Sequence, residues 1–167
     1  MPDLVLEELL TGRGAHADPI ACVSDLNAEL AGREQDGFPY TIFQLAAHMN
    51  YWMDFEWARI LGERPHYPDH ASESWTASPA PAAEQEWKTT VDKFSENIAR
   101  FRGLAQLDSE DLARELPPLA PSQSRRENTV LAAVWQIAAH NSYHTGQIAL
   151  LRRVLGAWPP AAGGDTW

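Results

Sequence analysis

Apolar residues recur at intervals of three and four along most of this chain, which is the spacing of one buried face of an α-helix. The pattern predicts four long helices, near residues 19–32, 41–61, 79–106 and 129–155, after a shorter helical segment at residues 4–10. Alternating runs of Val, Ile and Thr, which would mark strands, do not occur. The sequence therefore predicts an all-α protein built as a four-helix bundle.

Capping residues support the ends of several of these helices. Asp18 followed by Pro19 is typical of a helix start, because proline is favoured at the first helical position. Thr41 and Gln44 have the spacing of a capping box at the start of the second helix. Gly156 follows the last helix, as expected of a residue that ends a helix in a left-handed conformation.

The connection between the second and third helices, residues 63–77, is long for a bundle loop. Fully extended, it spans roughly 50 Å, whereas the second helix is roughly 30 Å long. The connection can therefore cross the whole bundle, and we predict that the helices on either side of it run parallel. It is rich in Pro, His, Tyr and Trp, which suits a segment that folds over the bundle. Its two histidines, His66 and His70, are expected to face solvent.

Composition and charge narrow the class of protein. A chain of 167 residues with 44% hydrophobic residues predicts one domain over residues 1–167. The net charge of −10 argues against nucleic acid or an anionic membrane as partner. The start of the chain lacks the features of a signal peptide, and no apolar run approaches the roughly 20 residues that span a bilayer. The single cysteine, Cys22, is expected to be a packed core thiol. We therefore expect a soluble, cytoplasmic protein.

Three histidines are candidate metal ligands. His140 and His144 stand one helical turn apart, so both side chains lie on the same face of the last helix. His48 lies on the inward face of the second helix. A single histidine is usually an ordinary core or surface residue, but three on inward faces each need partners for both ring nitrogens. Three such ligands predict a metal site with open positions, as catalytic sites have.

Other polar and small residues near these histidines allow two interpretations each. Gln147 continues the stripe of His140 and is expected either to hydrogen-bond a ligand or a group that supports one, or to make a hydrogen bond inside the bundle. His16 is either a fourth ligand or lid residue, or an exposed or capping residue. Gly146, in a helix interior, indicates the close approach of a neighbouring helix or a ligand, or simple helix packing.

Two runs of this sequence resemble the DinB-like (DinB/YfiT-like) family of metalloenzymes. They are residues 140–148 (HNSYHTGQI) and residues 45–52 (LAAHMNYW). Supporting similarity lies in residues 14–19, 61–63 and 151–158, so the resemblance covers almost the whole chain. It implies a four-helix bundle with an up-down-down-up order of helices.

The resemblance also implies chemistry. It implies a divalent metal, commonly nickel or zinc, held by His48, His140 and His144. It further implies a thiol S-transferase that uses a low-molecular-weight thiol such as bacillithiol, mycothiol or glutathione, and a homodimer. The partners would then be a small-molecule thiol and an electrophile.

Alternative functions use the same ligands. A metal-dependent isomerase or hydrolase is one, and a non-catalytic metal-binding bundle with a structural or stress-related role is another. A structural site normally closes with a fourth protein ligand. No cysteine or carboxylate stands out as that ligand, which favours the enzyme. The sequence indicates neither the electrophile nor any catalytic residue beyond the metal ligands.

Overall fold

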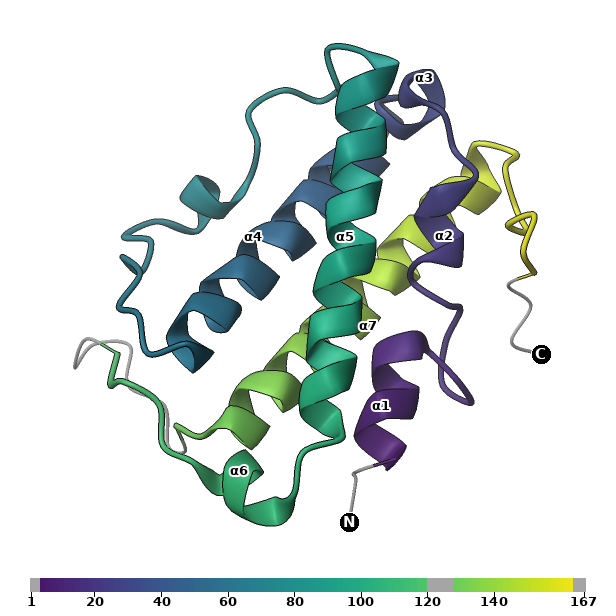
Figure 1. Ribbon diagram of the computed structural model, residues 1–167. Coiled ribbons are helices and arrows are strands. Elements are labelled where there is room, and N and C mark those ends of the chain that lie inside the picture. Colours follow the sequence, from purple (N-terminus) through teal and green to yellow (C-terminus); the bar gives the residue numbers. More distant parts are fainter. Residues whose placement is uncertain (1–3, 120–127, 164–167) are drawn as a thin grey trace.

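A computed structural model describes residues 4–119 and 128–163 (Figure 1). Its helices are α1 (Leu4–Thr11), α2 (Ala21–Ser24), α3 (Ala28–Ala31), α4 (Ile42–Ile60), η1 (Ala71–Ser74), α5 (Glu84–Ala105), α6 (Ser109–Ala113) and α7 (Val130–Val154). Within the described ranges there is no strand, only one isolated bridge between Glu115 and Thr129. The prediction of an all-α protein is confirmed.

The three long helices α4, α5 and α7 form the body of the bundle (Figure 1). Near the start of α4, the Thr41 hydroxyl donates to the carbonyl of Pro79 at 2.6 Å, shortly before α5 begins. Further along both helices, the Asn97 side-chain amide donates to Asp54 at 3.1 Å. Residue pairs that advance together in this way show that α4 and α5 run parallel, as the long crossover predicts.

Helix α7 and the N-terminal segment run the opposite way. Arg59, at the end of α4, hydrogen-bonds Asn128, just before α7 begins, so α7 is antiparallel to α4. Glu7 in α1 pairs with Arg102, late in α5, at 2.8 Å. The N-terminal segment then travels back along α5 toward its start (Figure 1).

The predicted first long helix, residues 19–32, is wrong: it is divided into α2 and α3. Asn27 caps α3, because its side chain accepts from the backbone N–H of Leu30 at 2.9 Å. The carbonyl of Leu26 is meanwhile taken by the indole N–H of Trp87 at 2.7 Å. A local cap and a distant partner thus compete with the helical hydrogen bonds at the break. The apolar spacing predicts helical backbone in this segment, but it does not require the helix to be unbroken.

The predicted start of the third helix, at residue 79, is also wrong, since α5 begins at Glu84. Pro81 disfavours helical backbone at the residue before it, which explains the late start. The capping box of Thr41 and Gln44 is present at the start of α4. The Thr129 side chain caps α7 by accepting from Ala132 at 3.2 Å.

Arg152 ties the N-terminal segment to the end of α7. Its guanidinium is buried and donates to both carboxylate oxygens of Asp25, at 2.6 and 3.1 Å. It also donates to the carbonyls of Cys22 at 2.9 Å and Ala157 at 3.0 Å. Cys22 itself is fully buried, as predicted, and burial raises the pKa of its thiol to about 11. None of the described helices is long and apolar enough to cross a membrane.

Candidate metal centre

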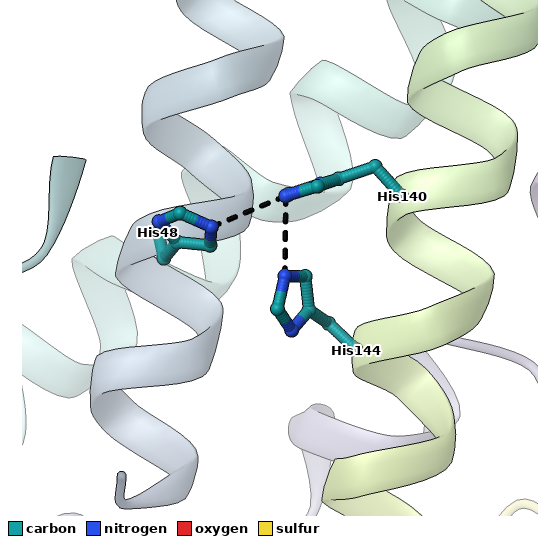
Figure 2. A group of neighbouring side chains, drawn as sticks. All are labelled: His48, His140 and His144. Carbon is teal, nitrogen blue, oxygen red and sulfur yellow. Dashed lines mark hydrogen bonds between the residues drawn. The ribbon is translucent and has the colours of Figure 1, made fainter. Parts of the chain in front are cut away.

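Three imidazole rings meet between α4 and α7 (Figure 2). His140 Nε2 lies 3.1 Å from Nε2 of His48 and 3.1 Å from Nε2 of His144. The candidate ligand atoms of the three rings all lie within 4.8 Å of one another. The helical repeat brings His140 and His144 to the same side of α7, and the antiparallel packing of α4 against α7 brings His48 opposite them. The structure therefore brings together all three histidines that the sequence singled out.

The other ring nitrogen of two of these histidines is held by an oxygen acceptor. His48 Nδ1 lies 3.1 Å from the carbonyl oxygen of Ser74, at the end of η1. His144 Nδ1 lies 2.6 Å from Oε1 of Gln147, one turn further along α7. A carbonyl oxygen accepts only, so Nδ1 carries the proton in each ring. The Nε2 lone pairs of both rings are then directed at the common point where the three rings meet. Acceptors of this kind orient the ligands in metal sites.

His140 completes the donor set. Its Nδ1 faces the side-chain oxygen of Asn141 at a longer distance of 3.4 Å. With Nδ1 protonated in His48 and His144, only a proton on His140 Nε2 could join these atoms. One proton serves at most one of the two contacts, so the other brings two lone pairs together, and they repel. A cation at the common point removes this repulsion. Two imidazole nitrogens bound to zinc at a tetrahedral angle lie about 3.3–3.4 Å apart, close to the 3.1 Å separations seen here. The residues present therefore fit a divalent metal.

Burial keeps the three rings neutral. Desolvation lowers the pKa of His48 to about 4 and that of His140 to about 4. Desolvation also lowers the pKa of His144. A metal binds only the unprotonated imidazole. At neutral pH the site therefore presents three ligands in the form that a metal requires, without first having to lose protons.

An aromatic stack covers one side of the site. The indole of Trp75 lies between the rings of Tyr40 and His48, with centroids 3.6 and 3.8 Å away and planes nearly parallel. Trp75 follows directly after η1, so the same turn of the crossover supplies both this stack and the Ser74 carbonyl. The aromatic content of the crossover is evident from the sequence, but no pattern in the sequence assigns these residues a role. Their contact with His48 depends on the path of the loop.

A cavity of about 210 Å³ is lined in part by His140. Its lining combines aromatic, aliphatic and polar side chains from α4, the crossover and α7: Trp52, Glu56, Tyr67, Gln136, Ile137 and His140. The Glu56 carboxylate pairs with Arg59 at 2.8 Å, and both side chains are only 1% exposed. The cavity offers room for a small molecule beside the metal centre.

The remaining candidate histidines lie elsewhere. His16 donates from Nδ1 to the carbonyl of Ala17 at 2.8 Å, and its Nε2 lies 2.8 Å from the hydroxyl of Ser142. It does not join the three-histidine group, which is the only such group found in the described part of the chain. His66 and His70 are exposed, as predicted.

Comparison with known protein families agrees with this site. The model of the DinB superfamily matches residues 15–148, and the chain belongs to this superfamily. The matched region contains His48, His140, His144 and Gln147. The resemblance seen in the sequence is therefore confirmed. Neither the curated proteins nor the solved structures include a match to this chain.

Replacing Gln147 with leucine is expected to weaken zinc binding by about 10- to 100-fold, the range typical of losing a group that orients a ligand. The change removes the acceptor of His144 Nδ1, so this ring loses its fixed orientation. Competition with a chromogenic chelator measures the affinity. Gln85→Leu, which changes an exposed glutamine of α5 outside the site, is the control and should bind zinc as the unchanged protein does. Equal affinities for all three proteins would rule out this role for Gln147.

Proposed function

We propose that this protein is a metal-dependent enzyme that transfers a low-molecular-weight thiol to a small electrophile. The observation that carries the proposal is the convergence of three Nε2 atoms whose rings are already oriented for a metal. Imidazole ligands suit both nickel and zinc, and these are our candidates. The proposal extends the DinB resemblance, which implies thiols such as bacillithiol, mycothiol or glutathione.

The donor set favours catalysis over a structural role. Structural zinc sites normally have four protein ligands, whereas catalytic sites have three and an open position. The group formed by the described residues contains three histidines. A cavity adjoins one of them, His140, so an open position would have space beside it. When bound, the divalent metal would act as a Lewis acid that favours the thiolate at neutral pH.

The surrounding residues have separate tasks in this proposal. His48, His140 and His144 hold the metal, while the Ser74 carbonyl and Gln147 fix ring orientations. The Trp75 indole shields the face of His48 from water. The electrophile would occupy the cavity against the rings of Trp52 and Tyr67, whose centroids are 5.6 Å apart. We place the protein in the cytoplasm, where small thiols are kept reduced.

Thiol transfer is tested with metal-loaded protein, a panel of the three thiols and an aryl halide as electrophile. We expect at least one thiol to form the thioether faster than it does without protein. His144→Ala should abolish the acceleration, and His66→Ala, an exposed histidine outside the site, should retain it. Mass spectrometry of the product and loss of free thiol are the readouts.

Two results would contradict the proposal. One is the absence of acceleration with every thiol although zinc and nickel are bound stoichiometrically. The other is metal-dependent cleavage of an ester that proceeds equally well without a thiol, which would favour a hydrolase that uses the same ligands.

A further inference from the structure

A second cavity, of about 380 Å³, lies where the crossover leaves the end of α4. We call it the crossover cavity. Part of its lining comes from the start of the crossover, between residues 63 and 69, and part from residues 117–119, which follow α6. Arg59 of α4 also lines it and donates to the carbonyl oxygen of Pro117 at 3.2 Å. The segment after α6 is thus held beside the end of α4 (Figure 1).

Arg59 carries a donor that no described residue accepts. Its side chain is 1% exposed, and its two terminal nitrogens donate to Glu56, to the carbonyl of Pro117 and to Asn128. Its Nε is also buried, but it has no acceptor within the described part of the chain. Buried donors in native proteins are nearly always satisfied. A ligand oxygen that reaches Arg59 from the crossover cavity supplies the missing acceptor, and carboxylate is the group that arginine binds best.

Charges of both signs surround this cavity. The ionisable side chains that line it and are exposed are Glu63, Arg64, His66 and Asp69. None of them makes a side-chain hydrogen bond or ion pair with another residue of the described ranges, unlike the exposed pair of Arg33 with Glu29. A ligand with a single charge would meet like charges here as well as opposite ones. A ligand with both a carboxylate and an ammonium group can pair with both kinds, and an α-amino acid is the smallest such group.

The crossover cavity borders the smaller cavity, which is lined in part by His140. The ring of Tyr67 lines both. Glu56 lines the smaller cavity and pairs at 2.8 Å with Arg59, which lines the crossover cavity. The smaller cavity also has the ring of Trp52 in its lining. A site for an aromatic group therefore lies next to a site for a charged group.

We propose that the two cavities together bind a small molecule in which an aromatic group is joined to an α-amino-acid group. The aromatic group lies against the rings of the smaller cavity. The carboxylate accepts from the Nε–H of Arg59 and pairs with Arg64, while the ammonium group pairs with Glu63 and Asp69. As the electrophile of the proposed function, this molecule is an aromatic amino acid whose reactive carbon lies at or beside the ring. That role rests on the proposed function, whereas the binding itself does not.

Isothermal titration calorimetry tests the class of ligand. The probes are L-phenylalanine and its homologues with one and two further methylene groups, which differ in the length that spans the cavities. Protein without added metal or thiol is used, because an α-amino acid chelates zinc on its own. We expect at least one probe to bind at least about 10-fold more tightly than its analogues without the carboxylate or without the ammonium group. No binding by any probe, or equal binding by either analogue, would overturn the proposal.

Arg64→Gln tests the contact with the carboxylate. Arg64 is exposed, so the variant should fold, and binding of the best probe should weaken by about fivefold, an effect near the upper end for an exposed ion pair. The analogue without a carboxylate should bind both proteins equally. Arg33→Gln, which changes an exposed arginine outside both cavities, is the control and should bind the probe as the unchanged protein does. Equal affinities for both variants would contradict the placement of the carboxylate.

The double variant Glu63→Gln, Asp69→Asn tests the contact with the ammonium group in the same way. It should weaken binding of the best probe but leave the analogue without an ammonium group unaffected. Glu34→Gln, Asp36→Asn removes the same number of exposed carboxylates outside both cavities and is the control. The same loss in both double variants would show only an effect of net charge and would overturn this contact. Since neither metal nor thiol is present, a failure of thiol transfer does not change any of these expected results.

Discussion

Replacing His144 with alanine is expected to raise the Kd for zinc or nickel by more than about 100-fold, which exceeds the usual loss for a change outside the ligands. The variant removes one of three imidazoles and leaves only His48 and His140 at the site. It also removes the Nδ1–H group that donates to Oε1 of Gln147. Two ligands from two helices hold a metal far less firmly than three.

His66→Ala is the matched control for this experiment. His66 is exposed and lies in the crossover, outside the three-histidine group, so its loss should leave the affinity unchanged. Affinity is measured by competition with a chelator at pH 7.5, and a circular dichroism melt verifies that both variants fold. Equal affinity of His144→Ala and the unchanged protein would place the metal elsewhere.

The second large effect concerns stability: Arg152→Met is expected to lower the free energy of unfolding by about 3 kcal/mol. Methionine retains much of the apolar volume but none of the donors. Asp25 would lose its bidentate partner, and the carbonyls of Cys22 and Ala157 would lose their donors. Arg152 joins the N-terminal segment to α7, so its loss weakens a contact between distant parts of the chain.

Urea unfolding measures the free energy of unfolding of Arg152→Met, with Arg33→Met as the control. Arg33 forms an exposed pair with Glu29, and such pairs contribute about 0–1 kcal/mol. Both variants lose one positive charge, so the difference between them reports the buried contacts. A change below about 1 kcal/mol in Arg152→Met would contradict this account of the fold.

The contribution of the Arg152–Asp25 pair to stability is expected to depend on pH. Hydrogen bonding from Arg152 lowers the pKa of Asp25 in the folded protein. A lowered pKa stabilises the fold above the unfolded value, near about 3.9, and this contribution is lost as pH falls through the folded value. The difference in stability between the unchanged protein and Arg152→Met should therefore shrink below about pH 4. A difference that stays constant down to pH 2 would show that the ion pair contributes little.

The sequence predicted the parts of this molecule that short-range rules control. The capping box at Thr41 and the periodicity of α4 and α7 depend on neighbours within a few residues. The i, i+4 spacing of His140 and His144 likewise follows from the helix alone. Together with the expectation that His48 faces inward, these rules were enough to locate the three-histidine group.

Long-range contacts explain what the sequence did not predict. The break between α2 and α3 depends on Trp87, about 60 residues away, taking the carbonyl of Leu26. The stack of Trp75 on His48 and the bond from His48 to Ser74 both depend on the path of the crossover. Composition indicated that the crossover would fold over the bundle, but no spacing rule assigned its residues to the site.

X-ray absorption spectroscopy of protein loaded with one equivalent of zinc tests the central claim most directly. We expect three imidazole nitrogens at about 2.0–2.1 Å from the zinc. At least one further oxygen or nitrogen ligand should exchange with solvent or added thiol. Added thiol should introduce a sulfur neighbour at about 2.3 Å. Four protein ligands that no added thiol displaces, or fewer than three imidazoles at the zinc, would contradict the claim that these histidines form an open metal site.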